Sequence, residues 1–239
     1  MRNDIELRNI LFLDIETVPA SPDFLSLDED WQALWADKTR FLQEREQKSA
    51  EELYDRAGIY AEFGKVICIS TAILTQEGGK EAMRVKSFYG DDEAELLGSF
   101  SNVLDRFFSG KEKYLCGHNV REFDAPFMAR RMLIHGMSLP DLLNTPGKKP
   151  WEVKHLDTLD LWKFGDYKHF TSLRLLTKLF GIPSPKDDIS GADVWRVYWQ
   201  ENDLERIKTY CEKDTIAVCN LYRRMNNLAL IRDEDIEVV

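Results

Sequence analysis

The sequence predicts an α/β fold in which a mixed sheet is flanked by helices. Three apolar segments rich in β-branched residues come early and are joined by turns, which is typical of antiparallel strands. Later apolar segments alternate with helical ones. These apolar segments are expected to add strands to the sheet, and the alternation indicates the α/β class. The chain has 239 residues, 44% of them hydrophobic, enough for one sizeable core. No internal repeat or low-complexity linker interrupts it, so we expect a single domain over residues 1–239.

The first predicted strand is Arg8–Val18, a nearly continuous apolar run interrupted only by Asp14 and Glu16. Residues 20–63 differ in character, because they open with a turn rich in Pro, Ser and Asp and continue as a charged, mostly helical stretch. We interpret this stretch as an insertion after the first strand, packed over the sheet edge or the mouth of the site. Its large apolar residues at helical spacing are Trp31, Leu34, Trp35, Phe41 and Leu42.

Beyond the insertion, strands give way to alternating strands and helices. A Gly78-Gly79 turn joins the second and third strands, and Pro126 fits the first turn of a helix, where its missing N–H costs little. The predicted strands are Lys65–Leu74, Met83–Tyr89, Lys113–Cys116 and a strand-like stretch within His155–Trp162. The predicted helices are Asp91–Ser109, a helix that starts around Phe123–Pro126, and the segments Ser172–Phe180, Asp193–Tyr198 and Leu204–Leu228.

Charge, cysteine usage and hydropathy exclude several classes of protein. The formal net charge of −10 argues against coating nucleic acid with a large basic surface, but it allows an enzyme that holds a few phosphates. The four cysteines show no C-x-x-C pair and no common zinc-site spacing, which predicts reduced, buried thiols. The apolar run Ile10–Leu13 is too short for a signal peptide or a membrane span. We therefore expect a cytoplasmic protein.

Two carboxylates share one face of the first strand. Strand side chains alternate, so Asp14 and Glu16 point the same way as Phe12. Two carboxylates on a buried strand repel each other and lose hydration, which is costly unless a cation compensates. A solvated position at a frayed strand end is the alternative, because the D-x-E pattern alone is common.

The C-terminal helix carries an acidic residue on its apolar seam. Asp214 lies three residues after Cys211 and four before Val218, where an apolar residue is expected, and Tyr210 lies one turn earlier on the same side. A carboxylate on a core-facing seam needs a partner, which can be a cation, a buried salt bridge or a structural Asp–Tyr hydrogen bond. The seam consists of Ile207, Cys211, Val218, Leu221 and Met225.

A third acidic position, Asp124, follows Asn119 and Phe123 where a strand end runs into a helix. Helix N-termini favour anions through unpaired N–H groups and the helix dipole. A plain capping residue is therefore a strong alternative to a catalytic one at this position.

The three motifs together resemble the DEDD exonuclease superfamily, whose motifs have the forms D-x-E, N-x-x-x-F-D and Y-x-x-x-D. The order and the spacing agree with that pattern. A tyrosine in the third motif indicates the DEDDy branch, since the histidine branch would have His where Thr209 stands. The runs Asp-Ile-Glu-Thr at 14–17 and Gly-His-Asn at 117–119 most resemble the exonuclease domain of family B DNA polymerases, here without a polymerase. The motif residues are Asp14, Glu16, Asn119, Phe123, Asp124, Tyr210 and Asp214.

This resemblance implies a ribonuclease H-like fold and a site for two divalent cations. Oxygen-only ligands suit Mg²⁺ or Mn²⁺ and not zinc. By analogy, Asp14 bridges both ions, Glu16 and Asp214 hold one of them, and Asp124 acts mainly through water on the other. The resemblance also implies that Tyr210 orients the attacking water. The residues implied to contact the terminal nucleotide are Thr17, Asn119 and Phe123.

The function that the resemblance implies is stepwise removal of nucleotides from the 3′ end of single-stranded or frayed DNA by two-metal-ion hydrolysis. An exoribonuclease of the same superfamily is an alternative, because the sequence does not show whether the site binds or excludes the 2′-hydroxyl of RNA. A non-catalytic nucleic-acid-binding or scaffold module is a second alternative. The presence of all four carboxylates and the tyrosine argues against that module.

Several other polar residues are interpreted as structural. No histidine has a metal-ligand spacing, and Asp157 fits a turn or a helix cap better than a place in the site. The pair Lys148-Lys149, in a loop between two prolines, is the basic pair that we expect to contact phosphates. The histidines are His118, His135, His155 and His169.

Overall fold

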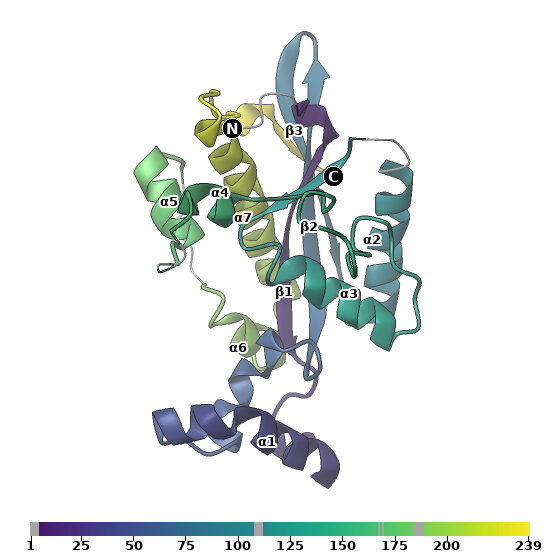
Figure 1. Cartoon of the computed structure of the whole chain (residues 1–239), viewed down its shortest axis with the longest axis vertical. Helices are drawn as coiled ribbons and strands as arrows, with labels where there is room; N and C mark the ends of the chain where they lie inside the picture. The colour runs from purple at the N-terminus through teal and green to yellow at the C-terminus, as the bar shows by residue number, and fades with distance from the viewer. Residues whose placement is uncertain (1–4, 108–111, 167, 169, 184–188) are drawn as a thin grey trace.

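The computed structural model describes residues 5–107, 112–166, 168, 170–183 and 189–239, and within them six strands form one mixed sheet (Figure 1). The strands are β1 (Ile10–Pro19), β2 (Gly64–Glu77), β3 (Lys80–Tyr89), β4 (Tyr114–Gly117), β5 (His155–Asp157) and β6 (Ile236–Val238). They lie in the order β5-β4-β1-β2-β3-β6. The strand β2 is antiparallel to both of its neighbours, β1 and β3. The strand β4 runs parallel to β1, β5 runs parallel to β4, and β6 runs parallel to β3. The predicted α/β fold with a mixed sheet is confirmed.

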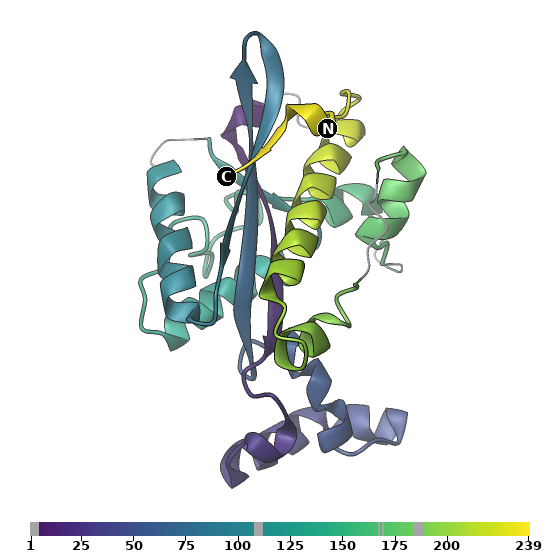
Figure 2. The ribbon, with the colours of Figure 1, turned by 180° about the vertical axis from the view of Figure 1, so that it is seen from behind.

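Helices cover both faces of the sheet. The helices α2 and α3 lie on one face and α7 crosses the other, with α4 and α5 beside it (Figures 1 and 2). Their bounds are α2 (Glu93–Phe107), α3 (Asp124–Ile134), α4 (Thr158–Lys163), α5 (Leu173–Phe180), α6 (Val194–Trp199) and α7 (Leu204–Met225). No described helix combines the length and the apolar character needed to cross a bilayer.

The side chains of β1 alternate between two cores, as predicted. Leu11, Leu13 and Ile15 pack in the cluster that includes residues of α2 and α3. Phe12 packs in the opposite cluster, where its ring lies 5.8 Å from that of Tyr222 on α7. Burying each such side chain stabilises the fold by about 1.5–3 kcal/mol. The alternation therefore directs Asp14 and Glu16 to the α7 face of the sheet.

The segment between β1 and β2 is helical and has a small core of its own. It contains a 3₁₀ turn (Phe24–Ser26), α1 (Glu29–Glu46) and a 3₁₀ helix (Glu51–Ile59). The 3₁₀ helix packs against β1, whereas α1 extends beyond the end of the sheet (Figure 1). The expected position over the sheet edge thus does not hold for α1. Its core residues are Trp35, Leu53, Tyr54, Ala57 and Phe63, and Trp31, Leu34 and Phe41 remain exposed.

Several element boundaries differ from the sequence prediction for local reasons. The first strand begins at Ile10, because a 3₁₀ turn occupies Leu7–Asn9. The stretch 155–162 divides into β5 and α4, since Asp157 accepts the backbone N–H groups of Leu159 and Asp160 and caps the helix. The short strand β6 was not predicted. Residues 108 and 109, at the end of the helix predicted for 91–109, lie outside the described residues.

Candidate active site

The middle of β1 supplies the first two carboxylates of the site. Asp14 is half-buried and Glu16 is only 7% exposed. Across the antiparallel pair, Asp14 faces Ser70 and Glu16 faces Cys68 on β2. The register then shifts between Glu16 and Thr17, and such an irregularity bends a strand and redirects the residues that follow it.

The helix α7 supplies Tyr210 and Asp214, both half-buried. Cys211 between them is fully buried, and its Sγ lies 3.3 Å from the backbone oxygen of Asp14. One turn later, Thr215 Oγ1 donates to the backbone oxygen of Ser70 at 3.2 Å. These two contacts fix α7 against β1 and β2. The Tyr210 hydroxyl hydrogen-bonds to Asp214 on the same helix.

Asp124, at the start of α3, supplies a buried carboxylate from a third segment. It is 3% exposed, and the residue in the N-cap position is Phe123, which makes no side-chain capping bond. Asp124 is therefore the first residue of α3 and not its N-cap, so the plain capping role considered for it does not apply. Asp124 raises the pKa of both Asp14 and Glu16, so its charge lies close to theirs.

The turn that leads to Asp124 is held by Asp157 at the end of β5. Asp157 is 3% exposed and accepts the backbone N–H groups of Asn119 at 2.9 Å and Arg121 at 3.0 Å. Asn119 has a φ of 68°, a left-handed conformation that asparagine tolerates better than most residues. A glycine is required at position 117, the last residue of β4, because an added Cβ would lie 2.7 Å from the Cβ of Val120.

Burial and mutual repulsion together disfavour the charged form of these carboxylates. Desolvation, followed by the charges of Glu16 and Asp214, raises the pKa of Asp14 well above its usual value. Desolvation, followed by the charge of Asp214, does the same to the pKa of Glu16. Desolvation and the nearby Asp157 raise the pKa of Asp124 to about 7, although backbone hydrogen bonds oppose the rise. The four carboxylates therefore form one electrostatically coupled cluster.

Tyr210 is held in its protonated form. Desolvation, followed by the charges of Asp214 and Glu16 and by the hydrogen bond to Asp214, raises the pKa of its hydroxyl far above neutral pH. The phenol therefore cannot act as a base at physiological pH. It can donate one hydrogen bond and accept others.

The donor set of this cluster fits divalent cations. Glu16 is buried, yet it has no hydrogen bond or ion pair with any residue in the described part of the chain. Buried charges are normally paired or coordinate metals. Carboxylate oxygens from Asp14, Glu16, Asp124 and Asp214 are the donors that Mg²⁺ and Mn²⁺ prefer. A cation would neutralise the repulsion that adds to desolvation in raising the pKa of Asp14 and Glu16.

The residues expected to contact a nucleotide lie around this cluster. Thr17, half-buried, follows Glu16 directly at the register shift of β1. Asn119 is half-buried in the turn that leads to α3. Phe123 packs partly against the core beneath α3, and its ring lies 5.5 Å from that of Phe127. All three therefore retain some accessible surface.

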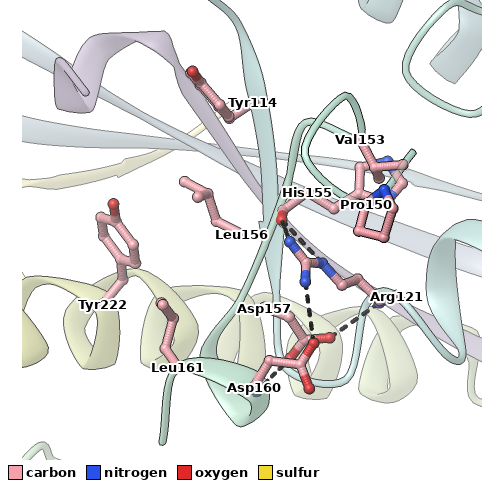
Figure 3. A pocket seen from close by; sticks show the side chains of 10 residues that line it. All are labelled: Tyr114, Arg121, Pro150, Val153, His155, Leu156, Asp157, Asp160, Leu161 and Tyr222. Carbon is pink, nitrogen blue, oxygen red and sulfur yellow. Dashed lines mark hydrogen bonds and ion pairs between the residues drawn. The ribbon is translucent and has the colours of Figure 1, made fainter. Parts of the chain in front are cut away.

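A surface pocket of about 350 Å³ lies along β5, and none of the four carboxylates lines it. Figure 3 shows Arg121 reaching across it to the backbone oxygen of His155 and to Asp160. Asp157 lines the same pocket and also bonds the backbone of Arg121. Asp157 is therefore the link between this pocket and the acidic cluster.

Sequence reasoning missed two features of the site. The predicted cap role of Asp157 is confirmed, because its side chain caps α4, but the sequence did not show that the same side chain also holds the turn before Asp124. It did not place Cys68 near the site, because the register that sets Cys68 opposite Glu16 is not visible in the sequence.

The remaining polar candidates contact the protein itself. His118 bonds to Thr158 and Thr171 through its two ring nitrogens, and His135 bonds to Glu93. His155 bonds to a backbone oxygen, and His169 lies outside the described residues. Lys148 donates to the backbone oxygen of Asp141, so its expected contact with phosphate stays a prediction.

A family model described as a predicted 3′–5′ exonuclease related to the exonuclease domain of PolB matches residues 59–235. The chain belongs to this family. The matched range includes Asp124, Tyr210 and Asp214, whereas Asp14 and Glu16 precede it. Membership confirms the resemblance to exonuclease domains of family B polymerases.

Solved structures and curated proteins add less. Among 69 matching chains of solved structures is the family B DNA polymerase from the hyperthermophilic archaeon Pyrobaculum calidifontis. It is 18% identical, the match covers 87% of this chain and 23% of that chain, and the TM-score is 0.48. The present chain thus spans less than a quarter of that polymerase. No curated protein matches the chain.

Proposed function

We propose that this protein is a metal-dependent 3′–5′ exonuclease that removes nucleotides from single-stranded or frayed DNA. The observation that carries the proposal is the approach of carboxylates from α3 and α7 to the pair on β1, where the charges of Asp124 and Asp214 add to desolvation in raising the pKa of Asp14 and Glu16. Such a cluster is unfavourable by itself and becomes favourable with bound cations. Membership in a family of predicted 3′–5′ exonucleases supports the same reaction.

The four carboxylates Asp14, Glu16, Asp124 and Asp214 would hold two divalent cations, Mg²⁺ or Mn²⁺. Bound there, the cations would activate water and neutralise charge on the scissile phosphate and on the leaving 3′-oxygen. Asp14 and Glu16 are fixed by a strand in the middle of the sheet, and Asp214 by a helix packed on that strand. Rigid elements of this kind hold ligands more precisely than loops do.

Tyr210 would orient the attacking water and not deprotonate it. Its raised pKa keeps the proton on the hydroxyl, and its hydrogen bond to Asp214 fixes the ring beside the carboxylates. Holding a nucleophile in line lowers the barrier because the entropy of positioning is lost before the reaction. The tyrosine would thus contribute to the rate and little to cation affinity.

The terminal nucleotide would contact Thr17, Asn119 and Phe123. These side chains flank the acidic cluster and keep accessible surface. Asn119 offers amide donors and acceptors, and Phe123 offers the edge of a ring on which a base can pack. Asp157 fixes the turn that carries Asn119 and so sets where the amide lies.

A labelled oligonucleotide tests the proposal. With Mg²⁺ or Mn²⁺, 5′-labelled single-stranded DNA should give a ladder of shortened products, and 3′-labelled DNA should release labelled mononucleotide first. The Asp14→Ala substitution and an added chelator should each abolish both the ladder and the release of labelled mononucleotide. Glu205→Ala is a matched control, because it removes an exposed carboxylate from the same helix as Asp214. We expect it to retain the ladder.

The same assay separates the alternatives. Faster shortening of a matched RNA oligonucleotide would indicate an exoribonuclease and overturn the DNA preference. Intact DNA and RNA with both metals, combined with measurable strand binding, would indicate a non-catalytic module. A ladder that persists in Asp14→Ala would point to a contaminating nuclease and remove support for the assigned site.

A further inference from the structure

Two thiols lie beside the acidic cluster, and the proposed hydrolysis uses neither. Cys211 on α7 is fully buried, and its Sγ lies 3.3 Å from the backbone oxygen of Asp14 and 3.7 Å from Asp14 Oδ2. Cys68 on β2 is also fully buried, faces Glu16 across the strand pair and hydrogen-bonds to Cys211. The site therefore presents sulfur donors as well as oxygen donors.

Three of these side chains are spaced closely enough to share one cation. Sγ of Cys211 and one carboxylate oxygen each from Asp14 and Glu16 lie within 4.8 Å of one another. Zinc bonds are about 2.3 Å to sulfur and about 2.0–2.2 Å to carboxylate oxygen, so modest side-chain rotations suffice. The second observation is Glu16, which is 7% exposed and has no counter-charge among the described residues.

This mixed donor set favours a different cation from the one that hydrolysis needs. Carboxylates and water suit Mg²⁺ and Mn²⁺, whereas a thiolate selects zinc and similar thiophilic ions. We propose that Zn²⁺ binds to Asp14, Glu16 and Cys211 and inhibits the exonuclease by competing for the two carboxylates. On binding, the Cys211 thiol and any protonated carboxyl group of Asp14 or Glu16 release their protons to solvent, and zinc exchanges bound water for these ligands. The inhibition rests on the proposed exonuclease function, but the zinc site does not.

Cobalt provides a direct test, because a thiolate ligand gives Co²⁺ a sulfur-to-metal charge-transfer band that oxygen ligands do not give. The full chain with one equivalent of Co²⁺ should show this band, and Cys211→Ser should lose it. Cys219→Ser is the matched control, since Cys219 is also fully buried on α7 but lies in the core cluster with Phe12. Absence of the band in the unmodified chain, or its survival in Cys211→Ser, overturns the proposal.

Zinc affinity and inhibition give a second test. Cys211→Ser and Cys211→Ala should weaken Zn²⁺ binding by more than the roughly 10- to 100-fold that loss of an outer hydrogen-bond partner costs. Zinc should then inhibit Mg²⁺-dependent hydrolysis at a lower concentration in Cys219→Ser than in either Cys211 variant. Each rate is compared with that variant's own zinc-free rate. Equal inhibition of all variants contradicts the proposal.

The outcomes distinguish the zinc site from the proposed function. Hydrolysis with Mg²⁺ but no cobalt–sulfur band overturns the zinc site and leaves the exonuclease standing. A band without hydrolysis supports the zinc site and overturns the exonuclease. If both Cys211 variants fail to fold, X-ray absorption at the zinc edge of the unmodified chain decides. A sulfur neighbour at about 2.3 Å supports the site, and a shell of oxygen and nitrogen alone overturns it.

Discussion

At the residue scale, Glu16 is unusual because the fold removes its carboxylate from water without giving it a basic partner in the described part of the chain. Glu16 and Asp124 are 7% and 3% exposed, and repulsion within the cluster adds to the desolvation of Asp14 and Glu16. The buried Glu93, by contrast, accepts hydrogen bonds from Arg131 and His135, and its pKa is lowered.

The cation-free protein should lose stability as the pH rises through the range in which Asp124 titrates. The pKa of Asp124 is about 7 when folded, against an ordinary value of 3.8. Between these values the folded state keeps a proton that the unfolded state releases, so the free energy of unfolding falls with rising pH. In chelator, the Tm should decline between about pH 4 and about pH 7.

Mn²⁺ should restore the Tm above neutral pH, and Asp124→Asn should flatten part of the decline because an amide does not titrate. Thermal unfolding followed by circular dichroism measures both effects. A Tm in chelator that rises over the same range would show that these carboxylates are not held in their protonated form.

Tyr210→Phe tests the role of the hydroxyl. Loss of positioning should slow hydrolysis on the order of 100-fold, while Mn²⁺ affinity should stay nearly unchanged because the phenol is not a ligand. Single-turnover kinetics measure the rate of hydrolysis, and a Mn²⁺ titration measures the affinity for the cation. Equal loss of rate and affinity would assign Tyr210 to the cation site instead.

At the element scale, the site depends on contacts between segments that are distant in the sequence. The sequence predicted the seam of α7 and the alternation of β1, because both patterns are periodic within one element. It did not predict β6, a strand of three residues that pairs with β3 from the other end of the chain. It also did not place Cys68 beside Glu16, since strand register depends on tertiary packing.

Asp157 is the junction between β5, α4 and the turn before α3, so its removal should affect both stability and rate. Asp157→Ala leaves the backbone N–H groups of Asn119 and Arg121, which make part-buried hydrogen bonds, without their acceptor. We expect this loss to lower the free energy of unfolding by about 3 kcal/mol. Hydrolysis should slow as well, because the turn positions Asp124. Denaturant unfolding and single-turnover rates measure the two effects.

Asp160→Ala is the control for Asp157→Ala. Asp160 lies on α4, the short helix that Asp157 caps, and pairs at the protein surface with Arg121 and Lys163. Its loss should change stability by less than about 1 kcal/mol. Comparable destabilisation by both variants would mean that Asp157 contributes only helix capping.

For the whole molecule, the net charge of −10 limits how the chain can hold a polyanion. Binding should depend on a few local contacts near the site and not on a broad basic surface. The sequence predicted the fold class and the ordered motifs, since these follow from patterning over nearly the whole chain. It left the position of α1 open between the sheet edge and the mouth of the site, because helical spacing identifies an amphipathic face but not what that face contacts.

The salt dependence of strand binding should be correspondingly shallow. With about three phosphate contacts, a plot of log affinity against log salt concentration should have a slope of about −2 for single-stranded DNA. Fluorescence anisotropy with Ca²⁺ in place of Mg²⁺ measures it. A slope several times steeper would reveal a basic track that the charge distribution does not suggest.

Crystals soaked with Mn²⁺ and a mononucleotide test the central claim most directly, because anomalous scattering locates the ions without reference to activity. The account predicts two manganese peaks among the carboxylates of Asp14, Glu16, Asp124 and Asp214, with the nucleotide phosphate between them. Well-ordered carboxylates with no anomalous peak beside Asp14 and Glu16 would contradict it.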